Sequence, residues 1–212
     1  MSTPKEQNYE NLADTLVEAF HRRGIEGFFC PTKEEALQTV LGLITPGSTV
    51  SWGGSVSCSE IGLFEALQDT DCTLIDRSLA KTPEDSRRIY AETVMSDFYF
   101  CSSNAVTLDG ELVNIDGNGN RVACLITGPS NVILIVGMNK IVKDVPTAID
   151  RVRNFAAPPN CLRLGLSTPC SKYGHCGDCY SSDCICSQIV ITRRSRVFGR
   201  IKVILVGEEL GY

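Results

Sequence analysis

Six of the eleven cysteines in this sequence lie in the single segment 161–186. Within it, Cys170, Cys176, Cys179 and Cys186 follow the pattern C-x5-C-x2-C-x6-C in a stretch rich in Gly, Ser and Asp. Such a stretch cannot become ordered by burying apolar side chains, so a bound metal centre would have to supply its order. The first residues contain no apolar core typical of a secretory signal, and metal or redox chemistry therefore explains the cysteines better than disulfides do.

The residue types in this segment restrict which metal it would bind. The chain has only two histidines, so the ligands must be nearly all thiolates, which suit either an iron–sulfur cluster or structural zinc. Zinc ribbons prefer two separate C-x2-C pairs, and only the pair Cys176–Cys179 is present. We therefore predict a 4Fe-4S cluster, with zinc as the alternative. The predicted ligands are Cys170, Cys176, Cys179 and Cys186.

Other interpretations of the cysteine segment stay open. Cys161, Cys184 or His175 could replace one of the four ligands. The six thiols could also be reduced and free of metal. A thioredoxin-like dithiol at Cys176-Gly-Asp-Cys179 is disfavoured, because that motif normally lies between a strand and a helix.

A second candidate site is the turn Trp52-Gly-Gly-Ser-Val-Ser57, which lies between a predicted strand and a helix starting near Ser59. Glycines allow a ligand to approach the backbone, and helix amides and hydroxyl groups donate hydrogen bonds to anions. The turn is not a Walker loop, a dinucleotide fingerprint or a nucleophile elbow. Glu60, one turn into the helix, is the candidate catalytic carboxylate. The alternative to an anion-binding turn is a plain tight turn, and the alternative to a catalytic Glu60 is a solvated glutamate. The expected anion-binding residues are Gly53, Gly54, Ser55 and Ser57.

Further polar side chains follow predicted strands or lie in a polar turn. Asn104 and Asn139-Lys140 come after strands, at the edge where open α/β sheets bind ligands. The segment 116–121, Asp-Gly-Asn-Gly-Asn-Arg, spaces its oxygens as a calcium loop does, but Arg121 and Thr127 stand where an EF-hand has Gly and Glu. A plain β-turn is the alternative to a ligand-binding turn. The expected ligand-binding residues of these segments are Asn104, Asp116, Asn118, Asn120, Asn139 and Lys140.

The elements that must position these residues alternate between helix and strand in the first half of the chain. Apolar spacing and capping residues predict helices over 9–23, 32–44, 59–67 and 83–95. Short apolar runs predict strands over 25–30, 49–52, 72–75 and 97–102. This alternation predicts an α/β fold, with an open, mostly parallel sheet and helices on both of its faces.

The second half of the chain has a different pattern. Short β-like segments at 105–107, 111–115 and 122–126, separated by turn residues, predict a β-meander insertion. A buried central strand is predicted over 132–136, a helix over 146–156 that Ala157-Pro158-Pro159 ends, and a last strand over 201–206. We predict a single domain over 1–212 that contains the cysteine-rich metal-binding loop 161–187.

Length, composition and charge exclude several classes of protein. A chain of 212 residues is too short for a multi-domain assembly, and 43% hydrophobic with 21% charged residues is typical of globular proteins. A net charge of −5 without a basic stretch argues against a nucleic-acid partner. The longest apolar run, 132–138, is too short to span a membrane. We therefore expect a cytoplasmic protein without a membrane partner.

These segments together resemble the lactate-utilisation (LUD) domain family. The resemblance is carried by 52–62, WGGSVSCSEIG, and by the long motif 103–123, SNAVTLDGELVNIDGNGNRVA. It continues through Gly128-Pro129, 137–142 and 157–160, and so covers nearly the whole chain. It implies a fold like that of the ribose-phosphate isomerase and CoA-transferase superfamily, and a link to the oxidation of lactate to pyruvate in complexes with iron–sulfur subunits.

One departure from the family pattern matters for function. In the lactate-oxidising systems the partner subunits usually hold the clusters, whereas here the cysteines belong to the LUD chain itself, as in a stand-alone branch typical of anaerobic bacteria. The resemblance thus predicts an iron–sulfur protein of lactate or small organic acid metabolism, without settling whether the chain is itself an enzyme. Its partners would be a small anionic substrate, an electron-transfer protein and, in a homodimer, a second copy. The alternative is an anion-binding or isomerase-like protein with a structural zinc.

Overall fold

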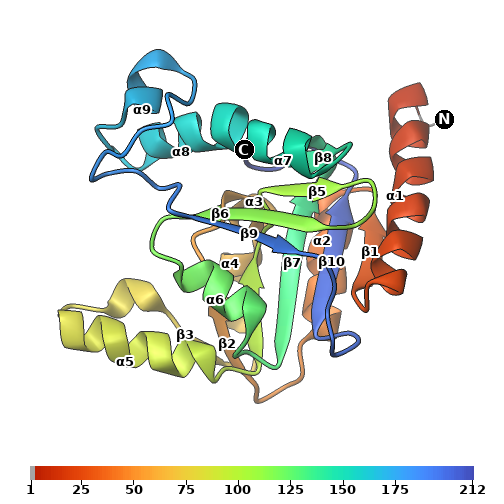
Figure 1. The fold of residues 1–212 in the computed structure, drawn as a ribbon. Coiled ribbons are helices and arrows are strands. Elements are labelled where there is room, and N and C mark those ends of the chain that lie inside the picture. Colours follow the sequence, from red (N-terminus) through yellow and green to blue (C-terminus); the bar gives the residue numbers. More distant parts are fainter. Residues whose placement is uncertain (1–2) are drawn as a thin grey trace.

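The structure, a computed structural model, describes residues 3–212 and contains two β-sheets with helices around them (Figure 1). The larger sheet has six strands in the order β1-β10-β7-β4-β2-β3, and every neighbouring pair is parallel. Its strands are β1 (Glu26–Cys30), β2 (Thr49–Trp52), β3 (Thr73–Ile75), β4 (Phe98–Cys101), β7 (Asn131–Gly137) and β10 (Ile201–Val206). The predicted α/β class with a mostly parallel sheet is therefore confirmed.

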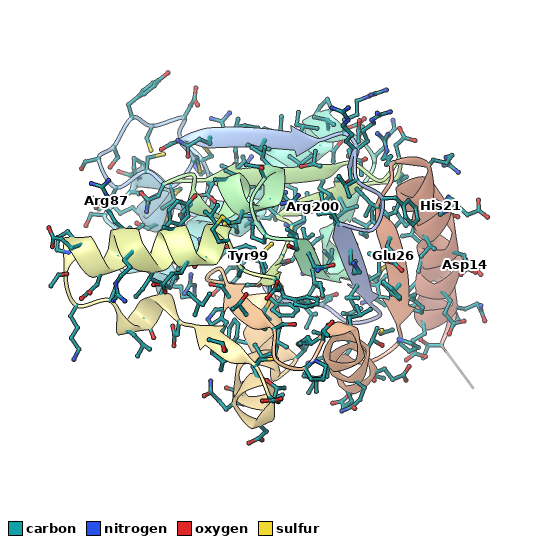
Figure 2. The ribbon with its side chains drawn as sticks, turned by 90° about the horizontal axis from the view of Figure 1, so that it is seen from below. Asp14, His21, Glu26, Arg87, Tyr99 and Arg200 are labelled. Carbon is teal, nitrogen blue, oxygen red and sulfur yellow. The ribbon has the colours of Figure 1, made fainter. Side chains whose placement is uncertain are left out.

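Helices cover both faces of the large sheet. Successive side chains of its central strands point to opposite faces, and those on each face are buried in a separate hydrophobic cluster. In β7, Leu134 and Val136 face one cluster, while Ile133 and Ile135 face the other. One face packs on α1 (Pro4–Arg22), α5 (Pro83–Val94) and α6 (Asn120–Ile126). The other packs on α2 (Lys33–Leu43), α3 (Val56–Glu60), α4 (Leu63–Ala66) and the 3-10 turn η1 (Leu67–Asp69). Figure 2 shows Tyr99 of β4 inside this packing, whereas Asp14, His21 and Arg87 lie at the periphery.

The smaller sheet lies between the large sheet and a layer of helices. Its strand order is β8-β5-β6-β9, comprising β5 (Ala105–Thr107), β6 (Leu112–Asp116), β8 (Ile141–Val142) and β9 (Gln188–Thr192). Val106 and Leu112 face the large sheet, and Ala105, Val113 and Ile115 face the outer helices. Those helices are α7 (Val145–Arg151), the π-helical turn η4 (Val152–Ala156), α8 (Ala157–Arg163) and α9 (Pro169–Tyr173), visible across the top of Figure 1. The remaining short turns are η2 (Arg77–Leu79) and η3 (Met138–Lys140).

Local sequence signals set most helix starts. Thr3, Thr32 and Thr82 each cap a helix by accepting a hydrogen bond from the amide three residues later. Thr3 and Glu6 complete a reciprocal capping box. None of the helices within residues 3–212 is both long enough and apolar enough to cross a membrane.

Three predicted elements differ in the structure. Segment 122–126 is not a strand but part of α6, because Val122 and Leu125, one helical turn apart, are buried together. The helix predicted over 59–67 begins at Val56 and is broken by Gly62, which has a left-handed backbone (φ 75°). The prolines at 158–159 do not end the helical stretch. Proline has no backbone N–H to donate to the preceding helical turn, and the wide π-helical turn directly before these two residues accommodates the missing hydrogen bonds.

Candidate functional site: a polar pocket beside a cysteine cavity

The first pocket lies where β2, β4 and β7 end, at the carboxyl edge of the large sheet. It has a volume of about 90 Å³ and is open to solvent on one side. Ligands of open α/β folds bind at this edge because loops and helix starts diverge there. The residues that carry its polar groups are Gly54, Ser55, Ser57, Ser102, Ser103, Asn104, Arg121, Lys140, Asn160 and Arg163.

Lys140 is the central cation of this pocket. Its side chain is only 4% exposed, and its Nζ donates to Ser57 Oγ at 2.8 Å and to Ser102 Oγ at 3.0 Å. Among the described residues that line the pocket there is no Asp or Glu. Burial, followed by repulsion from Arg151, lowers the pKa of Lys140 to about 8. Lys140 hydrogen-bonds only to hydroxyl oxygens, and the nearby Arg121 and Arg151 outnumber Glu60, the carboxylate that raises the pKa of Lys140, so the pocket is suited to an anion.

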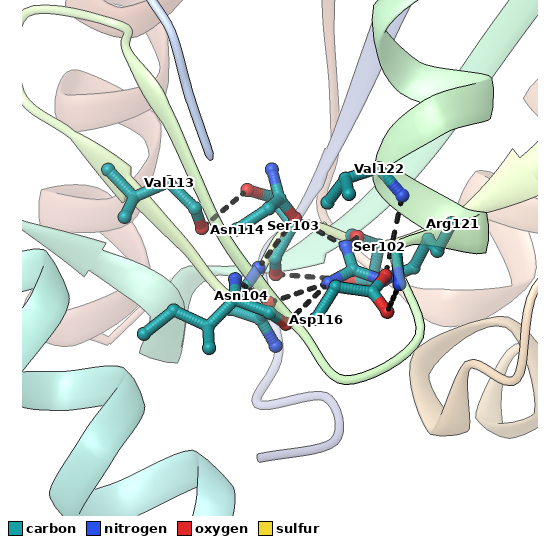
Figure 3. A network of polar contacts seen from close by, with 10 residues as sticks. Ser102, Ser103, Asn104, Val113, Asn114, Asp116, Arg121 and Val122 are labelled. Atoms are coloured by element: carbon teal, nitrogen blue, oxygen red, sulfur yellow. Dashed lines mark hydrogen bonds and ion pairs between the residues drawn. The ribbon is translucent and has the colours of Figure 1, made fainter. Parts of the chain in front are cut away.

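Arg121 ties the pocket wall together through the network in Figure 3. Its guanidinium donates to Asn104 Oδ1 at 2.9 Å, to Ile115 O at 2.9 Å and to Ser102 O at 3.1 Å, and also to Asn114 Oδ1. Its Nε lies 3.5 Å from Asp116 Oδ2. Because so many protein acceptors occupy its donors, Arg121 fixes the wall and offers a ligand mainly its positive charge.

A second arginine, Arg151, also supports the pocket and, like Arg121, contacts Asn104. Arg151 Nη1 donates to Asn104 O at 2.9 Å, and its Nε donates to Asn139 O at 3.2 Å. Burial lowers the pKa of Arg151 below its ordinary value. Arg151 thus holds the ends of β4 and β7 at a fixed separation, next to Lys140.

The structure brings five of the predicted anion-site residues together. Gly54, Ser55, Ser57, Asn104 and Lys140 line the polar pocket. Ser55 also caps α3, since its Oγ accepts from Cys58 N at 3.3 Å. With only five residues, α3 is too short to supply the helix-terminus dipole that the sequence suggested. The positive charge of Lys140 is the stronger attraction for an anion.

The other predicted residues of this site serve the fold or lie outside the pocket. Asp116 accepts from the amides of Gly119 and Val122, so it caps the start of α6. Asn139 exchanges hydrogen bonds with the backbone of Leu210. The residues that do not line the pocket are Gly53, Glu60, Asp116, Asn118, Asn120 and Asn139.

Glu60 and the two glycines have specific surroundings. Glu60 is exposed and its Oε2 accepts from Gly211 N at 2.7 Å, next to the pocket entrance. A Cβ on Gly53 would lie 2.8 Å from Tyr99 Oη, whereas one on Gly54 would lie 2.8 Å from Nη2 of the exposed Arg77. Neither glycine has a positive φ. Gly53 is therefore required by close packing, and Gly54 borders the pocket itself.

Sequence reasoning missed several polar residues of the pocket. Ser102 is the last residue of the predicted strand 97–102 and Ser103 directly follows it, so the sheet-edge rule that pointed to Asn104 could have included them. Arg121 was hidden because the segment after it was predicted as a strand. Asn160 and Arg163 belong to α8, which the proline pair was expected to prevent.

The second cavity contains all six clustered cysteines. It has a volume of about 110 Å³ and adjoins the polar pocket. The predicted metal-binding loop is only partly a loop, because Cys161 lies in α8 and Cys170 in α9. The cysteines that line the cavity are Cys161, Cys170, Cys176, Cys179, Cys184 and Cys186.

Hydrogen bonds to sulfur organise this cavity. Cys176 Sγ accepts from Arg153 Nε at 3.3 Å and from Asp178 N at 3.4 Å. Asp178 has a left-handed backbone (φ 50°), which is uncommon outside glycine and turns the chain between Cys176 and Cys179. Cys170 Sγ lies 3.7 Å from Cys161 Sγ and 3.2 Å from Thr168 Oγ1. Cys176 Sγ is therefore held by two donors, one of them a guanidinium group.

The spacing of the sulfurs bears on the kind of metal that would fit. Four thiolates around one zinc at ~2.3 Å would lie about 3.8 Å from one another, and Cys161 Sγ and Cys170 Sγ, 3.7 Å apart, have about this spacing. Across residues 3–212 no three Cys, His, Asp or Glu side chains converge on a point that could hold a single metal ion. Ligands of a polynuclear cluster bind different irons at separate corners, and six cysteines around one cavity are compatible with that arrangement.

Comparisons with known proteins agree with the fold. The family model described as "LUD domain" matches residues 13–206. The crystal structure of a DUF162 family protein from Deinococcus radiodurans aligns with a TM-score of 0.54 at 13% identity, covering 93% of this chain and 98% of that chain. eIF2B delta from Chaetomium thermophilum aligns at a TM-score of only 0.35 with 13% identity, over 64% of this chain and 54% of that one. No curated protein matches the sequence.

Proposed function

The chain belongs to the LUD domain family, and from this premise we propose that it is an iron–sulfur protein that binds a small organic anion, such as lactate or pyruvate, beside Lys140. The observation that carries the proposal is the buried ammonium group of Lys140, held by two hydroxyl groups in a pocket whose described lining contains no Asp or Glu side chain. An anion would supply the missing negative charge.

The size of the polar pocket supports a small ligand. Its volume of about 90 Å³ is below that of the ~150 Å³ engineered cavities that enclose benzene. A ligand of a few heavy atoms would fit inside, while a nucleotide would have to extend through the open side. This favours a short carboxylic acid over a dinucleotide.

The cysteine cavity is the proposed site of a 4Fe-4S cluster. Cys170, Cys176, Cys179 and Cys186 remain the proposed ligands, and Cys161 and Cys184 line the same cavity. A bound cluster would supply one-electron transfer, with an electron-transfer protein as the external partner. Six cysteines around one cavity, with two hydrogen bonds donated to Cys176 Sγ, support a metal centre at this place.

Different residues of the chain would bind the charge of the ligand, fix its position and exchange a proton with it. Lys140 in its charged form would bind the carboxylate of the ligand. Because its pKa is lowered to about 8, a fraction of Lys140 is neutral near pH 7 and can accept a proton from a hydroxyl group. Arg121 and Arg151 hold the surrounding strand ends in place, so the ligand meets a preorganised wall.

Two measurements test the proposal. Anaerobically purified protein should contain iron and show a broad absorption shoulder near roughly 400 nm, as expected for thiolate-to-iron charge transfer. Calorimetric titration with lactate and pyruvate should show binding that Lys140→Met weakens by about 1–3 kcal/mol, as for a lost charge-assisted hydrogen bond. Lys143→Met is the matched control, since Lys143 is exposed and three residues away. Equal affinities in all three proteins would contradict the anion site.

The alternative function is an anion-binding or isomerase-like protein with a structural zinc. The observation in its favour is the 3.7 Å distance between Cys161 Sγ and Cys170 Sγ, which suits two ligands of one zinc. A colourless protein that contains one zinc per chain and still binds the anion would support it.

A further inference from the structure

The polar pocket and the cysteine cavity share a wall. Ile115, Ala157, Ile185 and Cys186 line both spaces. We propose that this wall links the two sites, so that an anion bound beside Lys140 lowers the reduction potential of the cysteine centre, and reduction of that centre weakens anion binding. The inference rests on the proposed function, because it needs both the anion and the cluster.

The chemistry of the wall favours strong coupling. Three of its four residues are apolar, and Ala157 contributes only a methyl group, so a ligand and the sulfur atoms are separated by one layer of side chains. Cys186 is itself a proposed cluster ligand and also borders the polar pocket. Charges separated by apolar material rather than water interact strongly, since the effective dielectric constant is low.

A single helical turn also contacts both sides of the wall. In the π-helical turn η4, Val152 and Ala156 line the polar pocket, while Arg153 donates to Cys176 Sγ. Asn154 Oδ1 accepts from Cys176 N at 3.1 Å. π-Helical turns are rare and concentrate at functional sites. A shift of η4 caused by a ligand would therefore reach Cys176 directly.

The charges of the pocket determine the direction of the effect. Lys140, Arg121 and Arg163 place positive charge beside the wall, which favours an added electron on the cysteine centre. A bound carboxylate offsets part of that charge and so disfavours reduction. Thermodynamic linkage requires that reduction weaken the binding of the same anion by the same factor.

The test is a redox titration of the holoprotein, followed by visible absorbance, with and without saturating pyruvate. Dithionite supplies one electron per cluster, and no bond to pyruvate forms or breaks. We expect pyruvate to bind the reduced protein at least tenfold more weakly, which corresponds to a potential lowered by ~59 mV for one electron. The shift should persist from 0.05 to 0.5 M NaCl, because buried charges are poorly screened. Lys140→Met should abolish it and Lys143→Met should retain it.

The outcomes separate this inference from the proposed function. Protein without iron, or without calorimetric binding of pyruvate, would overturn the proposed function and this inference with it. A protein that holds the cluster and binds pyruvate, yet shows the same potential with and without it, would overturn the linkage alone. A shift that disappears at high salt would also overturn it, since the coupling would then pass through solvent instead of the shared wall.

Discussion

The polar pocket and the cysteine cavity adjoin each other but are built in different ways. The polar pocket is formed by the ends of buried strands and by arginines whose donors are occupied by protein acceptors. Much of the cysteine cavity is formed by the segment 174–187, whose residues are mostly half-buried or exposed. The first site is therefore preorganised by the fold, whereas we expect the second to depend on the proposed metal centre for much of its order. The two should respond differently to loss of metal and to loss of a buried arginine.

The largest effect expected is loss of the metal from the cysteine cavity. Cys176→Ser and Cys179→Ser should each abolish metal binding and increase proteolytic cleavage within about 169–187, while the α/β core stays folded. The measurements are iron and zinc content, limited proteolysis and circular dichroism. Cys72→Ser is the control, since Cys72 is half-buried and lies far from the cluster in sequence.

Two outcomes would change this assignment. Full metal content in both variants would contradict the proposed ligands. Cys184→Ser should keep its metal, because thiolates in C-x-C spacing often cannot both reach one cluster and Cys186 is the proposed ligand. Loss of metal in Cys184→Ser with retention in a Cys186→Ser variant would exchange these two roles.

The second effect concerns the network of the polar pocket. Arg121→Met should lower the free energy of unfolding by about 3 kcal/mol, because it removes at once the charged donor to Asn104 Oδ1, Asn114 Oδ1 and two backbone carbonyls. Urea unfolding of apo protein would measure it, and metal content should be unchanged. Arg87→Met is the control, since Arg87 is exposed and lies at the periphery in Figure 2. Equal stability of the two variants would show that the network does not hold the fold.

The third effect is the pH dependence of anion binding. Burial lowers the pKa of Lys140 to about 8, and a bound anion would raise it again by favouring the charged form. Pyruvate affinity should therefore be constant well below pH 8 and fall about tenfold per pH unit well above it. Calorimetry between pH 6.5 and 9.5 would measure this, with Lys140→Met as the variant that loses the dependence. A flat profile in the wild type would show that Lys140 does not supply the charge.

The sequence predicted the secondary structure and the sheet better than the arrangement of the two sites. The alternation of apolar runs and capping residues such as Thr32 and Thr82 is local, so the parallel sheet and the first helices could be predicted. The residues of the cysteine cavity were also predictable, because they are close together in the chain. That the two sites lie next to each other could not be predicted, since this depends on the helical stretch continuing through Pro158 and Pro159. Arg121 was missed for a similar reason, because its role depends on a helix that the β-like composition of 122–126 concealed.

The smallest effect expected separates the two glycines of the predicted anion loop. Gly53→Ala should destabilise the protein by about 1–2 kcal/mol, because the new Cβ would lie 2.8 Å from Oη of the buried Tyr99 and force packed atoms to move. Gly54→Ala should change stability by less than about 0.5 kcal/mol, since its φ is not positive and the exposed Arg77 side chain can move aside. Thermal unfolding of both variants would measure the difference, and pyruvate titration would show whether Gly54→Ala also weakens binding at the pocket wall. If Gly54→Ala binds pyruvate as the wild type does, backbone approach at this glycine is not part of the anion site, and Lys140 with its two serines carries the recognition alone.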